Sequence, residues 1–457
     1  MAGRFLVIPS LFFALTSALL FSAEPTRYAL RERCQDGQQW QVAMHTRVEV
    51  KAKASEAKAL VTARHSFWEH VLALADANAP VNQAGPIGVR PGLPRRVARY
   101  YDLADWQRQP LQALQTGFSS GKSEKRQLRD ERKLLIAQRW RDETVVFSPN
   151  GPLTREELDL TEGHLDVLMV PNLLPEGLVA VGESWTVPIP VVQALCGLDG
   201  VTESKVQARF ASVQKDRAVI VVEGKVDGIA DGCETTNTVQ AKLEYDLTFE
   251  RWTQLHWRQT QERQAGPITP ALHLVAEVQV SRQFGGRSSH LTPAVLQNLP
   301  GEPTVAFLLL SYRAPNGECE FLYDRGWHRV AQHERFAVFR LLDRGELVAQ
   351  MNVTFWPKAK PGEHLTAEQI REFAEKAPNF QPEKVIESGE IKSPDGRWIY
   401  RHTVQGKSEE LPIMLTWYVV ADTQGHQVVF VFTTEPTLAD KLGGRDLAIV
   451  QSASFPR

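Results

Sequence analysis

Apolar and polar side chains alternate along much of residues 40–53, with Val42, Met44 and Val48 on one side and His45 and Arg47 on the other. A period of two is typical of a β-strand with one buried face. The same pattern predicts further strands at residues 60–74, 133–138, 205–213, 218–226, 235–249 and 272–282. Long strands in succession predict a mainly antiparallel first domain, built as a curved sheet or half-barrel.

One helical section is expected among these strands, near residues 154–170. Thr154 and Glu157 have the spacing of a capping box, in which two side chains satisfy free backbone N–H groups at a helix start. The helix should end before Pro171, because proline breaks the helical hydrogen-bond pattern. A second, short helix is expected at residues 191–195, before Gly197.

The chain has 457 residues, and one domain commonly holds ~100 to 200. Residues 285–303 are rich in glycine and proline, which is typical of a linker. We therefore expect a β-rich domain at residues 24–284 and a second domain at residues 304–457. In the second, a capping box at Thr366 begins a helix, a final helix follows at residues 436–451, and strands are expected at residues 336–342, 347–355, 384–391, 398–404, 412–421 and 427–433. The fold class is α+β, and the second domain is expected to be an α/β/α sandwich.

The last third of the chain resembles the PsbP-like family of small exported domains. The resemblance rests on the order of the elements, on Gly326-Trp327 before the first strands, and on a terminal helix after residues 433–436. Members of that family generally act as accessory subunits bound to larger assemblies. The resemblance therefore implies a binding or interaction module. It transfers no functional residue, because no site motif of the family can be aligned.

The first 23 residues have the three parts of a secretory signal: Arg4, an uncharged run from Phe5 to Ala23, and small residues at its end. The alternative is an uncleaved anchor, because the run approaches the ~20 residues that span a bilayer. We expect cleavage, export to the periplasm or the exterior, and no membrane span afterwards.

The charges and cysteines exclude some classes of protein. With 52 basic and 54 acidic residues the net charge is -2, so no long-range field favours nucleic acid. An exported chain can form disulfides, and we expect a bond between Cys196 and Cys233. The alternative is that all four cysteines, which include Cys34 and Cys319, stay reduced.

The sequence indicates no catalytic, cofactor or metal site. The pairs His65 with His70 and His328 with His333 are five residues apart, so neither pair forms a shared metal site locally, and solvent-facing histidines are expected. The cluster of Glu162, His164 and Asp166 is interpreted as ordinary helix surface. No GxSxG motif or phosphate-binding loop occurs.

Tryptophans near the predicted strands are the remaining candidates for contact with a ligand or partner. Aromatic side chains there could line a groove, although core packing is the alternative. The candidates are Trp252, Trp257, Trp327, Trp398 and Trp417.

We expect an exported, non-catalytic binding or accessory protein that engages a protein partner or an apolar ligand. The alternative is a hydrolase whose acid and base residues meet only in the fold, near the junction of the domains. A cluster of His, Asp or Glu in one pocket would favour the hydrolase, and a smooth apolar concavity would favour a carrier.

Overall fold

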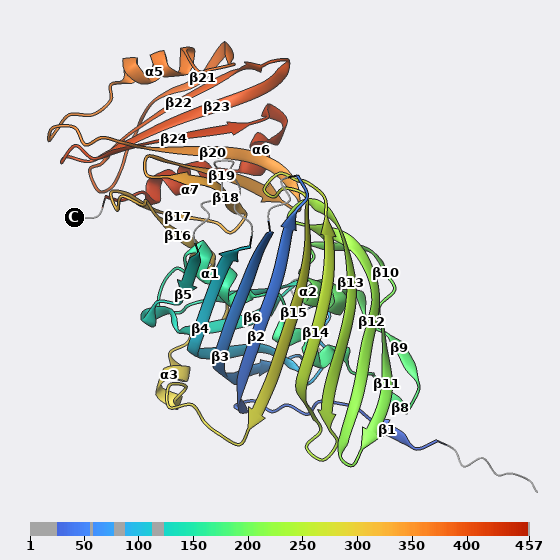
Figure 1. Ribbon diagram of the computed structural model, residues 1–457. Coiled ribbons are helices and arrows are strands. Elements are labelled where there is room, and N and C mark those ends of the chain that lie inside the picture. Colours follow the sequence, from blue (N-terminus) through green and yellow to red (C-terminus); the bar gives the residue numbers. More distant parts are fainter. Residues whose placement is uncertain (1–24, 55–57, 77–86, 112–122, 456–457) are drawn as a thin grey trace, which may run out of the picture.

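The computed structural model describes residues 25–54, 58–76, 87–111 and 123–455. The predicted leader, residues 1–23, lies outside them. The expected fold class is confirmed, because antiparallel sheets dominate and helices are few. Two large sheets, one above the other in Figure 1, form the body of the protein.

The first sheet is open, antiparallel and curved (Figure 1). Its strands follow the order β7-β6-β4-β3-β2-β15-β14-β13-β12-β11-β9, with β5 paired to β4 and β10 to β12. Their bounds are β2 (Gln39–Ala52), β3 (Lys58–Leu74), β4 (Pro94–Pro110), β5 (Glu124–Gln127), β6 (Leu134–Trp140), β7 (Glu143–Phe147), β9 (Ser184–Thr186), β10 (Gly200–Ser204), β11 (Gln207–Gln214), β12 (Arg217–Ala230), β13 (Cys233–Asp246), β14 (Arg251–Arg263) and β15 (Leu272–Phe284). A separate pair joins β1 (Arg27–Ala29) to β8 (Leu178–Ala180).

The alternation seen in the sequence decides which face of this sheet is buried. Along β2, Val42, Met44 and Val48 are buried, whereas His45 and Arg47 are exposed. We call the apolar side of this sheet its inner face. It must pack against another layer of the protein, because its apolar side chains have to be buried.

Three short helical segments supply much of that layer. They are α1 (Arg155–Glu162), the 3-10 helix η2 (Val167–Leu173) and α2 (Ile189–Cys196). The capping box at Thr154 is confirmed, and Gly197 ends α2 in a left-handed conformation. Every residue of η2 is buried, and its side chains belong to the same apolar core as the sheet.

The second large sheet has the order β18-β19-β20-β24-β23-β22-β21. Helix α5 (Ala367–Glu375) covers one face, packing on Tyr400 and Val419. The other face carries Phe430 and packs against α7 (Arg445–Ser452) and the β16–β17 pair. The expected final helix is broken into α6 (Ala439–Leu442) and α7, because Gly443 and Gly444 adopt positive φ. The remaining bounds are η1 (Asp130–Arg132), α3 (Pro293–Gln297), α4 (Val305–Leu308), β16 (Leu310–Arg313), β17 (Glu320–Tyr323), β18 (Trp327–His333), β19 (Phe336–Asp343), β20 (Glu346–Trp356), β21 (Gln381–Ile391), β22 (Trp398–Ser408), β23 (Leu411–Ala421), β24 (Gln427–Thr434) and η3 (Pro436–Leu438).

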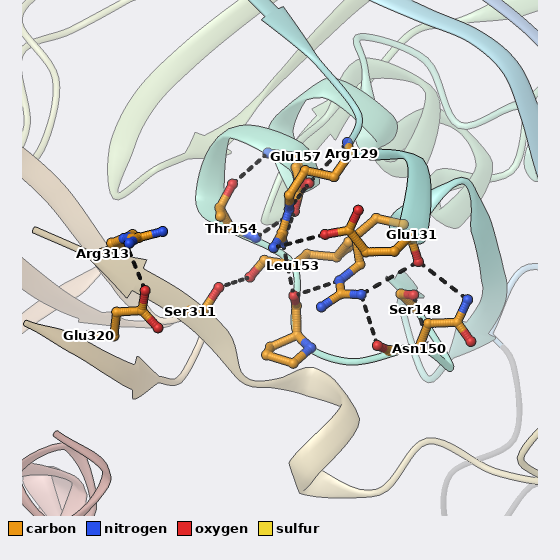
Figure 2. Close-up of polar contacts among 12 residues, drawn as sticks. Arg129, Glu131, Ser148, Asn150, Leu153, Thr154, Glu157, Ser311, Arg313 and Glu320 are labelled. Atoms are coloured by element: carbon orange, nitrogen blue, oxygen red, sulfur yellow. Dashed lines mark hydrogen bonds and ion pairs between the residues drawn. The ribbon is translucent and has the colours of Figure 1, made fainter. Parts of the chain in front are cut away.

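Residues at the start of α1 make hydrogen bonds that connect the first large sheet and its helices to residues of the second domain. The N–H of Ser311, on β16, donates to the carbonyl of Leu153 at 2.8 Å. Figure 2 shows the Ser311 hydroxyl directed at the same carbonyl oxygen, which lies 3.5 Å away. Beside it, Arg129 holds the carboxylate of Glu157 with two N–H groups, at 2.6 and 2.7 Å. Arg155, the first residue of α1, donates to the backbone carbonyl of Trp327 at 3.1 Å.

Two hairpin turns, one from each sheet, also touch. The β12–β13 turn consists of Asp231 and Gly232, and the β19–β20 turn of Arg344 and Gly345; all four residues have positive φ. Such two-residue turns suit the twist of antiparallel strands. A Cβ atom on Gly232 would lie 2.5 Å from the carbonyl oxygen of Gly345, so the backbones are in contact. In the described part of the chain, every helix is too short or too polar to cross a membrane.

We predict that Gly232→Ala lowers the free energy of unfolding by about 1 to 3 kcal/mol, because the new methyl group meets backbone and the turn requires positive φ. The change in the free energy of unfolding is measured by urea denaturation. Gly177→Ala is the matched control, since Gly177 has open space around its Cβ position and no positive φ. Equal stability of the two variants would contradict the proposed contact between the turns.

Candidate functional site

A cavity of about 1090 Å³ lies where the two sheets meet. Strands β2, β3 and β4 form one side, which we call the sheet face: Met44, Phe67, Arg99 and Tyr101. The loop after α1, the β6–β7 hairpin, the end of α2 and the β12–β13 turn line it further, together with residues around 325–328 and 342–345. We call its charged part the junction face: Arg139, Glu143, Glu162, His164, Asp199, Arg325 and His328.

Three carboxyl groups of the junction face have raised pKa values. Burial raises the pKa of Glu162 to about 7, against the opposing charge of Arg325. Burial also raises the pKa of Glu143, and burial together with Asp231 raises the pKa of Asp199. The Glu162 side chain is 40% exposed, and it lines the cavity, where other segments of the protein surround it. Near neutral pH, Glu162 can therefore donate or accept a proton.

The two arginines of the junction face are held mainly by backbone. Arg139 is almost fully buried, and its guanidinium donates to the carbonyls of Ile87 and Asp142. Arg325 donates to the carbonyl of Val146. Its nearest carboxylate contact is 3.8 Å, from Nη1 to Oε1 of Glu162. Arg139 also has a carboxylate contact, 3.9 Å from its Nη1 to Oδ2 of Asp166. Both arginines line the cavity beside these carboxylates, so a polar ligand there meets charges of both signs.

The histidines of this face are uncharged at neutral pH. Burial lowers the pKa of His164 to about 4, with a smaller effect from Arg263. Burial, together with Arg155, lowers the pKa of His328 to about 4 as well. Within the described ranges, no group of three or more His, Cys, Asp or Glu side chains is arranged to hold a metal ion.

The interpretation of Glu162, His164 and Asp166 as helix surface was wrong. Helix α1 ends at Glu162, because Gly163 has a φ of 61° and a non-helical ψ. His164 and Asp166 lie in the following loop, where the Asp166 carboxylate caps η2 by accepting the N–H of Leu168 at 3.1 Å. The end of α1 and this loop together bring all three residues to the wall of the cavity.

The expectation of solvent-facing histidines was wrong for His65. It is 3% exposed, and its Nε2 lies 2.8 Å from the carbonyl oxygen of Leu160 on α1. His328 also departs from that expectation, since it lines the cavity. His70 is half-buried, 3.0 Å from the side-chain nitrogen of Gln39, and His333 is exposed on the edge strand β18.

The five candidate tryptophans are not brought together. Trp252, Trp257 and Trp327 are buried in the apolar core. Trp398 and Trp417 are half-buried beside α5. The cavity described above is lined by none of the five.

The four cysteines are free in the structure, and the expected bond between Cys196 and Cys233 is not formed. Cys196 ends α2, where its carbonyl accepts from Gln259. The thiol of Cys233 instead lies 3.5 Å from the hydroxyl of Thr269. Cys34 is half-buried and Cys319 is buried.

Sequence reasoning missed most of the cavity. Arg99, Arg139, Glu143, Asp199 and Arg325 come from five different segments, and none belongs to a local motif. The cluster of Glu162, His164 and Asp166 was the one part of the site whose residues lie close together in the sequence.

No family model and no curated protein matches the chain. Among solved structures, the cyanobacterial PsbP protein (CyanoP) of Synechocystis is 18% identical over 35% of this chain and 98% of its own, with a TM-score of 0.27. A protein of unknown function from Pseudomonas aeruginosa is 17% identical over 33% of this chain and 97% of its own, with a TM-score of 0.23. Lipovitellin is 7% identical over 56% of this chain and 26% of its own, with a TM-score of 0.31. The PsbP-like resemblance is therefore one of fold alone, and similarity this low carries no argument about function.

We predict that Glu162→Gln gains stability relative to the wild type as pH rises from about 4.5 to about 7. The folded chain holds the Glu162 proton more tightly than a carboxyl with the ordinary pKa of 4.5 would, so wild-type stability falls across this window. The neighbouring Arg155, Arg325, Asp159 and Glu143 are unchanged in the variant.

Urea unfolding at several pH values measures the difference. Glu277→Gln is the control, because Glu277 is about half exposed and paired with Arg258 on the outer face. Parallel stability curves for wild type and Glu162→Gln would show that the Glu162 pKa is not raised.

Proposed function

We propose that this chain is an exported, non-catalytic binding protein that holds a small organic ligand in the cavity between its two domains. The observation that carries the proposal is the cavity of about 1090 Å³ lined by both parts of the chain. Small-molecule sites commonly occupy ~300 to 1,000 Å³ and often lie at domain interfaces.

The lining decides which ligand suits this cavity. An apolar ligand was expected from the sequence, but the cavity is lined by Arg139 beside Asp166 and by Arg325 beside Glu162. Glu143 and Glu162 add polar groups on the same face. A wholly apolar ligand would remove these charged groups from water without offering them a hydrogen bond, which is costly in a desolvated site. We therefore propose a ligand that carries at least one polar group.

The proposal is tested by native mass spectrometry of the chain purified from residue 24, before and after denaturing extraction. A bound small molecule that is released on denaturation supports it. A clean apo mass, combined with no change in thermal stability across a library of polar metabolites, would overturn it and favour a protein partner.

We predict that Gly200→Trp reduces ligand binding about tenfold or more, because a large side chain then competes for the cavity. Gly200 lines the cavity, has no positive φ, and has open space at its Cβ position. Isothermal titration with the extracted ligand measures the loss. Gly177→Trp, also at an open position, is the matched control and should bind normally.

A second candidate function is hydrolysis, and one specific observation favours it. Glu162 has a pKa of about 7 and shares the cavity with the uncharged His164 and His328. A carboxyl that titrates near the working pH suits general acid–base catalysis.

If the chain is a hydrolase, Glu162→Gln should lower kcat by about 10²- to 10⁴-fold, as expected for loss of a general acid or base. Chromogenic esters, phosphomonoesters and glycosides serve as substrates, and Glu277→Gln is the control. Turnover that survives in Glu162→Gln would remove Glu162 from the reaction, and no turnover in the wild type favours the binding function.

A further inference from the structure

A buried ion pair includes Arg99, one of the residues of the sheet face. On β4, Arg99 donates through Nε to Oε1 of Glu69 on β3, at 2.8 Å, and both side chains are at most 5% exposed. The other carboxylate oxygen, Oε2, accepts the indole N–H of Trp40 at 2.6 Å. Glu69 is thus satisfied on both oxygens, and its charge neutralises that of Arg99.

One hydrogen-bond donor of the Arg99–Glu69 ion pair has no acceptor in the described part of the chain. The Nη2 group of Arg99 is buried and has no hydrogen-bond partner among the described residues. Arg99 lines the cavity. A buried donor without an acceptor is costly and rare, so its place at a cavity wall points to an acceptor that arrives with a ligand.

The surroundings of this donor are aromatic. The guanidinium of Arg99 lies 5.2 Å from the centre of the Phe67 ring. Phe67 and Tyr101 have ring centres 4.7 Å apart, and Met44 lines the same face. This wall therefore fits an apolar or aromatic body beside the free Arg99 donor and the Tyr101 hydroxyl.

The charge balance decides what kind of acceptor fits. Since Glu69 already neutralises Arg99, an anion placed here would be buried without a counter-charge of its own. One hydrogen bond does not offset the desolvation of an anion. An uncharged carbonyl oxygen brings no charge to neutralise, so one hydrogen bond offsets far more of its desolvation.

We infer that the sheet face binds an uncharged acceptor oxygen, such as a ketone, ester or amide carbonyl, carried on an apolar or aromatic body, with the polar end of the ligand against the junction face. This inference rests on the proposed binding function and names its ligand class. It also accounts for a cavity with one aromatic wall and one charged wall.

The test compares three fluorescent probes: prodan, which is an uncharged naphthyl ketone; phenylnaphthylamine, which lacks a carbonyl; and anilinonaphthalene sulfonate, which is an anion. The double variant Glu69→Gln with Arg99→Met removes both charges and the free donor together. We expect it to weaken prodan binding about three- to tenfold, the effect of one hydrogen bond. Phenylnaphthylamine binding should not change.

A matched control makes the same change of charge on the same two strands. Arg64 and Asp105, on β3 and β4, form an exposed ion pair, and Arg64→Met with Asp105→Asn should leave all probes unaffected. Arg99→Lys is a second variant in case the double variant does not fold. It keeps a positive charge beside Glu69 but lacks the second guanidinium nitrogen, and it should show the same selective loss.

Each outcome has a definite meaning. A selective loss of prodan supports the inference. An equal loss of all probes, an unchanged prodan affinity, or tighter and Arg99-dependent binding of the sulfonate overturns it. If Gly200→Trp abolishes probe binding while these outcomes overturn the inference, the cavity still binds ligand and only the ligand class is wrong. Probe binding that is unaffected by Gly200→Trp overturns the cavity itself.

Discussion

An open, curved antiparallel sheet has an apolar inner face that must be covered, and the rest of this structure depends on that requirement. A closed barrel would fill its interior with its own side chains. Here the chain inserts α1, η2 and α2 against the inner face, and the whole of η2 is buried. The second sheet then packs at the end of the first, so that a single apolar core continues through both.

The helices do not cover the inner face where the two sheets meet, and this opening explains why charged side chains line the cavity. Helix α1 stops at Gly163, and the loop that follows turns polar side chains toward the second sheet. Arg325 reaches back across the opening to the carbonyl of Val146 on β7. The side chains of Glu162 and Arg325 stay partly exposed there, whereas Phe67 and Tyr101 on the sheet side are almost fully buried. The same cavity therefore has an aromatic wall and a charged wall, as a site for a ligand with two unlike ends requires.

Much of the fold could be predicted because its determinants are local. The alternation in β2, the capping boxes at Thr154 and Thr366, and the end of α2 at Gly197 depend on residues a few positions apart. The final helix could not be predicted in full, because periodicity does not register that Gly443 and Gly444 take up positive φ. Most residues of the cavity could not be predicted from the sequence, since they come from distant segments of the chain. The tryptophans, chosen for chemical type, serve mainly as core.

The sequence by itself determined the class of fold, the strand faces and the caps, because side-chain period and local hydrogen bonding act over a few residues. The tertiary structure alone decided which polar residues share a cavity. Burial among segments that meet at the cavity raises the pKa of Glu162, and Arg99 has a free donor because Glu69, which also accepts from Trp40, engages only its Nε. Burial and charge compensation depend on which segments meet, and no local pattern of residues encodes that.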